Sequence, residues 1–188
     1  MSWTRVSDGT KAGDNEVVLQ TKDSILFKGP KATLERSSLI KELLEARGDG
    51  DDTIPVSDVE ANTMELVLYW LQHHAGGAAM PTKVPRPLRK PLVEYVTPFE
   101  WEFITTKCLE GGDEAKHLNL LLVMKAANFL GISELRELST AMLAHMLKNK
   151  DIDQLHVLFA MELKGKRLGP AEFEKLYEKF PWMREVKA

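Results

Sequence analysis

The sequence predicts an α+β domain followed by a helical extension. Short alternating apolar segments are confined to the first third of the chain, whereas the segments from Phe99 onward have the apolar spacing of helices. Strands gathered ahead of a run of helices are typical of α+β proteins, not of the regular strand and helix alternation of α/β folds. The length of 188 residues suits one domain with an appended subdomain.

Two strands are predicted to form a hairpin near the start of the chain. Residues 17–28 contain alternating apolar side chains on either side of a turn at 22–24. A second short segment, residues 53–56, contains Pro55, which permits an edge strand but not a central one. We expect residues 1–16 to form a flexible tail.

Helices are predicted wherever apolar residues recur three or four positions apart. The predicted helices are residues 31–46, 59–74, 99–109, 114–130, 134–148, 152–161 and 171–180. Between Leu118 and Leu130 the only polar residues are Asn119, Lys125 and Asn128, so we expect that helix to be buried on more than one side. Gly131 then provides a helix end, and Ser133 provides a cap for the next helix.

Residues 76–93 are predicted to form a disordered basic loop. This segment contains four prolines, four Lys or Arg residues and no acidic residue. Two roles are open for it. The simpler one is a solvated insertion that keeps the chain soluble, and the other is contact with an acidic partner.

The overall charge and the cysteine content limit the possible partners and compartments. A net charge of −3 and a pI near 6.0 argue against nucleic acid as the main partner. Cys108 is the only cysteine, which excludes an internal disulfide and suits the cytoplasm or nucleus. We find neither a secretory signal near Met1 nor an apolar run of membrane-spanning length, and therefore expect a soluble protein with no membrane partner.

The residues that carry chemistry in other proteins form no recognisable site. His73 and His74 are adjacent and point in different directions on a helix, so they cannot chelate one metal ion. The acidic residues at 49–52 lack the spacing of a calcium loop, and no phosphate-binding or nucleophile motif is present. Cys108 has no matching catalytic histidine, which favours an inert thiol. We therefore predict no enzyme activity, no metal and no cofactor.

Six segments of the chain form a recognisable series: Val17–Asp23 (VVLQTKD), Ser38–Leu44 (SLIKELL), Val67–His74 (VLYWLQHH), Ala126–Ile132 (AANFLGI), Leu155–Met161 and Pro181–Trp182. In this order they resemble the Skp adaptor family, which links F-box proteins to cullins in SCF-type ubiquitin ligases. The resemblance implies a BTB/POZ-like domain at residues 17–132 and a helical, F-box-binding extension at residues 133–188.

The resemblance also implies which side chains contact each partner. Carried over by position, Asn128 and Phe129 would face the cullin. The residues implied on the F-box side are Leu120, Leu121, Met124, Leu143, Leu147, Phe159, Met161, Phe173 and Trp182. The unliganded adaptor is further expected to form at most a weak homodimer.

The sequence departs from the family pattern in several places. Phe129 stands where the family has tyrosine, residues 103–118 are longer, and residues 76–93 are basic where the family is commonly acidic. Two other assignments are open: an elongin-C-like or self-associating BTB protein, and a structural subunit of another assembly such as a kinetochore. Elongin-C-like chains usually lack the last two helices, which residues 151–182 are predicted to provide.

Overall fold

The computed structural model describes residues 3–46, 53–75, 83–109, 118–148, 150–158 and 169–181. The chain divides into two compact units, Met1–Lys150 and Asp151–Ala188. The predicted boundary after Ile132 therefore differs from the observed one. The helix that follows Ile132 packs on the preceding helix and belongs to the first unit.

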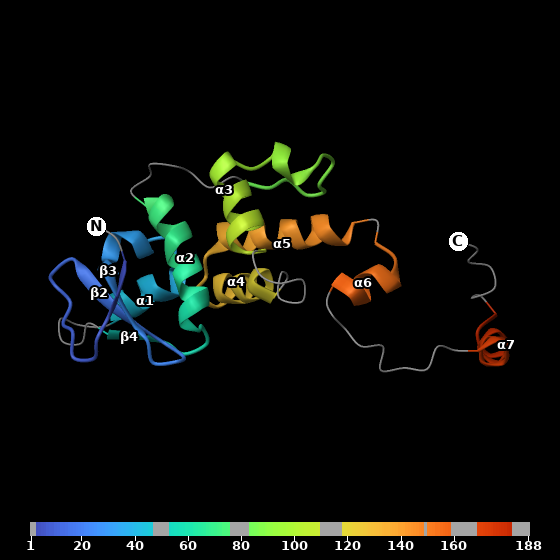
Figure 1. Ribbon diagram of the computed structural model, residues 1–188, viewed down its shortest axis with the longest axis horizontal. Coiled ribbons are helices and arrows are strands. Elements are labelled where there is room, and N and C mark those ends of the chain that lie inside the picture. Colours follow the sequence, from blue (N-terminus) through green and yellow to red (C-terminus); the bar gives the residue numbers. More distant parts are fainter. Residues whose placement is uncertain are drawn as a thin grey trace. The chain divides into compact units, whose positions relative to one another are not determined.

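The first unit contains a four-stranded sheet with the order β1-β3-β2-β4 (Figure 1). Its strands are β1 (Thr4–Val6), β2 (Glu16–Thr21), β3 (Leu26–Pro30) and β4 (Thr53–Val56). β2 and β3 form the predicted antiparallel hairpin, and β4 pairs with β2 in parallel. β4 is an edge strand, as Pro55 requires, since proline has no N–H to donate to a second neighbour.

Strand β1 lies in the segment that we predicted to be a flexible tail, and the prediction is wrong there. β1 pairs with β3, with Arg5 opposite Phe27. The Arg5 side chain lies 5.7 Å from the centre of the Phe27 ring and donates to the Glu65 carboxylate at 2.6 Å. The Trp3 ring covers Gly29 so closely that a Cβ on that glycine would overlap it. A three-residue strand is too short for its periodicity to be recognised in the sequence.

A serine divides the predicted helix at residues 31–46 into a 3-10 turn, Lys31–Leu34, and helix α1, Ser38–Ala46. The Oγ of Ser37 accepts a hydrogen bond from the backbone N–H of Ile40 at 3.3 Å, in the manner of a helix N-cap. A new helix therefore begins at this point.

Helix α2 (Ala61–His73) matches the prediction, and a short helix α3 (Pro98–Glu102) continues into a π-helical turn at Phe103–Lys107. α3 begins with a reciprocal cap: the Thr97 side chain accepts from the N–H of Glu100, and the Glu100 carboxylate accepts from the N–H of Thr97. The Glu100 carboxylate is only 1% exposed, and the cap supplies the hydrogen-bond donors that a buried polar group requires.

Helices α4 (Leu118–Phe129) and α5 (Ser133–Leu147) complete the first unit. Figure 1 shows α2 between the sheet and the pair formed by α4 and α5. The core is continuous through these layers. Its fully buried side chains include Leu19, Ile54, Met64, Trp70, Leu71, Leu120, Leu130 and Leu135.

Residues 83–93 correct the prediction of a disordered loop. Val84 and Leu88 pack against the core, and Leu92, in a 3-10 turn at Leu92–Glu94, is fully buried. These three apolar residues recur every four positions among the prolines and bases. That spacing was the available signal that the segment packs on the domain. The remainder of the predicted loop, residues 76–82, lies outside the described residues.

The second unit contains helices α6 (Ile152–Leu158) and α7 (Pro170–Lys179). α6 begins with a cap in which the Asp151 carboxylate accepts from the N–H of Gln154 at 2.8 Å. Pro170 occupies the first position of α7, where its missing N–H costs nothing.

Candidate partner-binding surface

Helix α4 has one buried face and one face partly open to solvent. Leu120 and Val123 are fully buried, while Leu118 is 54% exposed and Leu121 and Leu122 are half-buried. We expected this helix to be covered on more than one side. In the first unit α2 and α5 both pack on it, and the side that remains open retains apolar side chains that water must solvate.

Leu120 was the first residue that we assigned to F-box contact, and the structure contradicts this assignment. Leu120 is 0% exposed and belongs to the core cluster. Adjacent helical residues point about 100° apart, so Leu120 faces the core while Leu121 does not. Leu118 and Leu122 lie one turn apart on the open side, and we did not predict a role for either.

Helices α4 and α5 form a helical hairpin joined by a short turn at Leu130–Ile132. The start of α4 therefore lies at the same end of the hairpin as the end of α5 (Figure 1). Leu143 and Leu147, both assigned to F-box contact, are half-buried on the later part of α5. We call this end, with Leu118, Leu121, Leu122, Leu143 and Leu147, the leucine end of the hairpin.

The opposite end of the hairpin is fixed by a glycine. Gly131 has a φ of +67°, and the N–H of Ile132 donates to the carbonyl of Ala127 at 2.8 Å, which closes the helix with a Schellman motif. The hydroxyl of Ser37 donates to the carbonyl of Leu130 at 2.6 Å. The Ser37 hydrogen bond thereby holds the turn against the segment that starts α1. The position of Gly131 agrees with the predicted end of the helix.

Asn128 and Phe129, the residues assigned to cullin contact, lie beside this turn. Asn128 is exposed and its Oδ1 accepts from Nη1 of Arg136 at 3.3 Å, while Phe129 is half-buried against the core. Asn128 follows Leu121 by seven residues and Met124 by four, so all three share one side of the helix. Seven residues span about 10 Å along the axis. On α4, the two predicted surfaces are therefore separated along the length of the helix, and they do not lie on opposite faces of it.

Arg36 ties the turn end of the hairpin to the rest of the first unit. Its Nε donates to the carbonyl of His74 at 3.1 Å, and its Nη1 lies 3.2 Å from the Glu134 carboxylate. One side chain thus links the end of α2 with the start of α5.

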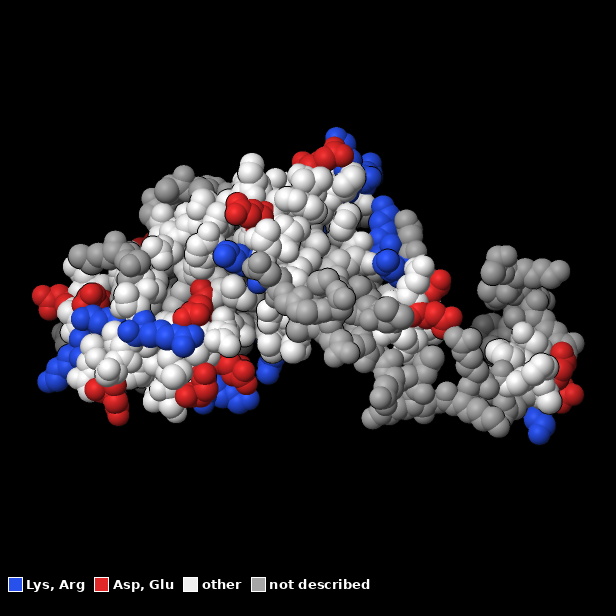
Figure 2. All heavy atoms as spheres, in the orientation of Figure 1, with Lys and Arg blue, Asp and Glu red and all other residues white. Residues whose placement is uncertain are grey.

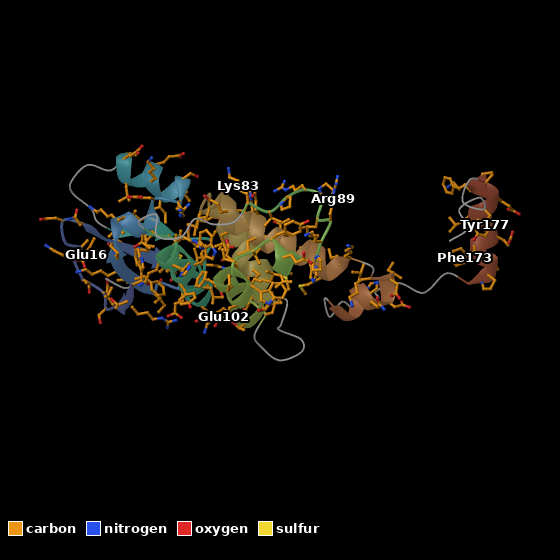
Figure 3. The ribbon with its side chains drawn as sticks, turned by 90° about the horizontal axis from the view of Figure 1, so that it is seen from above. Glu16, Lys83, Arg89, Glu102, Phe173 and Tyr177 are labelled. Carbon is orange, nitrogen blue, oxygen red and sulfur yellow. The ribbon has the colours of Figure 1, made fainter. Side chains whose placement is uncertain are left out.

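Helix α7 presents an aromatic stripe. The rings of Phe173 and Tyr177 lie 6.1 Å apart (Figure 3), and Phe173 and Phe180 are 40% and 37% exposed. The stripe has the helical spacing that we predicted. The other residues assigned to F-box contact in this part of the chain, Phe159, Met161 and Trp182, lie outside the described residues.

The described part of the first unit places Cys108 away from solvent. The thiol is fully buried, and burial raises its pKa to about 12, so it is uncharged near neutral pH and a poor nucleophile.

His73 stacks on Phe99, with the ring centres 3.4 Å apart. Among the described residues, no three His, Cys, Asp or Glu side chains gather closely enough to hold a metal ion. No helix in the described ranges is both long and apolar enough to span a bilayer.

Residues 15–76, which run from β2 to the end of α2, match the model of the Skp1 family tetramerisation domain. The chain is similar to Skp1-family proteins. Its fold, a small sheet with helices and a helical extension, is the mixed α+β, BTB/POZ-like type that the sequence predicted.

Similarity to proteins named as Skp1 homologs or SCF subunits extends over almost the whole chain. The S-phase kinase-associated protein 1 homolog of Tetrahymena thermophila is 27% identical over 175 residues, which cover 93% of this chain and 97% of that protein. The E3 ubiquitin ligase complex SCF subunit sconC of Talaromyces marneffei is 26% identical over 170 residues, covering 90% and 98%. The sconC subunit of Emericella nidulans is also 26% identical, over 172 residues. The aligned length therefore includes the helical hairpin.

Proposed function

We propose that this protein is a non-catalytic adaptor that joins an F-box substrate receptor to a cullin in an SCF-type ubiquitin ligase. The supporting observation is the leucine end of the helical hairpin, where α4 and α5 keep part-exposed apolar side chains in a chain similar to Skp1-family proteins. Relatives that align over 90% of the chain or more are SCF subunits by name. Exposed apolar surface on a stable domain is typical of a partner site.

On this proposal the F-box lies across the leucine end. Leu121, Leu143 and Leu147 keep the role assigned from the sequence, while Leu118 and Leu122 join them and Leu120 is removed because it is buried. The other proposed contacts are Met124, Phe159, Met161, Phe173 and Trp182. Apolar side chains that are already held by the core lose little freedom on binding, which favours affinity.

The cullin is proposed to bind at the turn end, around Asn128 and Phe129. The Schellman motif at Gly131 and the Arg36 contacts hold this end in one conformation. A rigid turn presents the exposed Asn128 amide in a constant position, as specific recognition requires. A separation of about 10 Å along α4 leaves room for two partners on one helix.

The adaptor acts by positioning, and none of its own groups is proposed to react with ubiquitin. The buried, uncharged Cys108 thiol is unsuited to the thioester chemistry of ubiquitin transfer. We further propose that the protein acts in the cytoplasm and nucleus, binds neither membrane nor nucleic acid in this role, and forms only a weak homodimer without its partners.

Reconstitution tests this function. The full chain is co-expressed with an F-box segment and the N-terminal domain of a cullin, each with a different affinity tag, and purified through both tags in succession. We expect one complex that contains all three chains in equal amounts. Binding to neither partner would contradict the proposal. Binding to the cullin without any F-box segment would favour an elongin-C-like adaptor, and a single fixed partner of another kind in cells would favour a structural subunit.

A further inference from the structure

A groove separates the segment before α3 from one face of α5. Its volume is about 530 Å³, within the range of roughly 300–1,000 Å³ that is usual for ligand sites. The residues that line it come from the segment before α3 and from α5, among them Leu88, Arg89, Ala141, Ala144 and Lys148. We call it the basic groove. Its α5 residues differ from Leu143 and Leu147, so it is distinct from the leucine end.

The charge of the basic groove is opposite to that of the chain as a whole. Four Lys or Arg residues and one acid line it, whereas the net charge of the chain is −3. Figure 2 shows Lys and Arg spheres at the edge of the first unit, where the segment before α3 approaches the end of α5. Figure 3 shows Lys83 and Arg89 on that segment.

Two of the four basic side chains form ion pairs with described acidic residues, and the other two do not. Arg86 lies 3.3 Å from the Glu137 carboxylate, and Lys90 lies 3.2 Å from that of Glu94. Arg89 and Lys148 form no ion pair with any acid in the described ranges of the chain. These two cations are therefore available to an incoming negative charge.

The walls between the charges are apolar and fixed. Prolines and the small residues Ala141 and Ala144 form much of the lining. Leu88 packs on the core, the Arg86 to Glu137 ion pair joins the two walls, and the N–H of Lys90 donates to the Tyr95 hydroxyl at 3.2 Å. A ligand would meet a preformed groove with an apolar lining and a basic rim.

We propose that the basic groove binds an acidic peptide segment of a partner protein, with acidic side chains at Arg89 and Lys148 and an apolar side chain against Ala144. Charge complementarity favours an acidic ligand over a neutral one. The apolar lining favours a peptide over nucleic acid, because it contains no Phe, Tyr or Trp ring on which a base could stack.

The test is a selection of random 12-residue peptides, displayed on phage, against the full chain. We expect enriched peptides to combine Asp or Glu with a large apolar residue. The strongest peptide is then synthesised with a fluorescent label and titrated by fluorescence polarisation. The variant Arg89→Glu/Lys148→Glu should weaken binding by tenfold or more, and Ala144→Trp should weaken it by filling the groove without a change of charge.

The matched control is Lys11→Glu/Lys107→Glu, which changes the net charge equally at two exposed sites outside the groove. It should bind like the unaltered chain. Circular dichroism establishes that each variant is folded, and Ala144→Trp, which leaves the charge unchanged, keeps the test valid if the charge reversal unfolds the chain.

Four results would overturn the proposal. These are the absence of enriched peptides, enrichment of neutral or basic peptides, equal binding to the charge-reversed and unaltered chains, and tighter binding of a single-stranded thymidine oligonucleotide than of the selected peptide. Sedimentation provides a separate check: a dimer that the charge reversal converts to a monomer would identify a second copy of the chain as the occupant instead.

Discussion

Helices α4 and α7 both carry apolar side chains at helical spacing, but α4 is apolar on nearly all sides whereas α7 has a single stripe. On α4 one side enters the core through Leu120 and Val123, and only the other side remains open. On α7 the aromatic stripe stays accessible, with Phe173 40% exposed. Apolar residues at helical spacing thus predict a helix with an apolar face that can pack on another surface. They do not determine whether the fold or a partner covers that face.

This difference between α4 and α7 predicts two modes of partner binding. The open side of α4 is held by the core, so a partner meets it already formed. The described residues of α7 are not part of that core. The order of the α7 stripe is therefore expected to depend on the partner, at an entropic cost that reduces the net affinity.

The sharpest contrast lies within α4, between the neighbours Leu120 and Leu121. Leu120→Ala should lower the free energy of unfolding by about 2–5 kcal/mol, because it leaves a cavity in a closely packed core. Leu121→Ala should change stability by less than about 1 kcal/mol and weaken F-box binding instead. Urea unfolding and F-box titration of both variants measure this. If both variants lost stability equally, the division of α4 into two sides would be incorrect.

The second contrast concerns α7 and the chain that follows it. Trp182→Ala should weaken F-box binding by about 2–4 kcal/mol, since buried indoles are common hot spots of interfaces, with little change in the unfolding of the first unit. Phe173→Ala should have a smaller effect in the same direction. Isothermal titration and thermal unfolding distinguish the two properties. A large drop in melting temperature without the F-box would mean that Trp182 packs permanently within its own chain.

The third contrast is between the two ends of the helical hairpin. Asn128→Ala/Phe129→Ala should weaken cullin binding by about 2 kcal/mol, while F-box affinity stays within experimental error. The matched variant is Leu147→Ala, at the leucine end, which should do the reverse. Pull-down with both partners measures the two effects. Unchanged cullin binding by the double variant would remove the turn end from the proposed function.

The smallest effect is expected far from these helices, at Asp23. Hydrogen bonds from the Thr21 hydroxyl at 2.7 Å and from the Ala61 N–H hold the pKa of this carboxyl below its usual value of 3.8. A lowered folded-state pKa contributes stability above that value, which is lost as the pH falls through the folded-state pKa. Asp23→Ala should cost about 1 kcal/mol or less at pH 7. Unfolding as a function of pH should show this difference shrinking in acid.

Prediction from the sequence succeeded where local patterns determine structure. The β2 and β3 hairpin, the edge strand with Pro55 and the end of α4 at Gly131 all follow from short-range rules on turns, proline and glycine. Family resemblance then identified the α+β, BTB/POZ-like fold.

The failures share a physical cause, since each depends on contacts between residues far apart in the chain. Leu120 and Leu121 are neighbouring residues of the same type, and only packing against α2 and α5 decides which side chain is buried. Residues 83–93 resemble a linker by their prolines, yet Leu92 is buried in the core of the first unit. The boundary after Ile132 was misplaced because the packing of α5 on α4 forms only in the folded chain and leaves no signal in the local sequence.

Strand β1 has a practical consequence for work with shortened chains. The family match begins at residue 15, which makes Asn15 a natural place to start a truncated protein. Such a truncation would remove Trp3 from Gly29 and leave the outer N–H and C=O groups of β3 unpaired along a flat edge. Unpaired edges recruit strands from other molecules, whereas a short edge strand that carries a charge, such as Arg5, discourages this. Precipitation of a chain cut at Asn15 would therefore reflect an uncovered sheet edge, even with its helical hairpin intact.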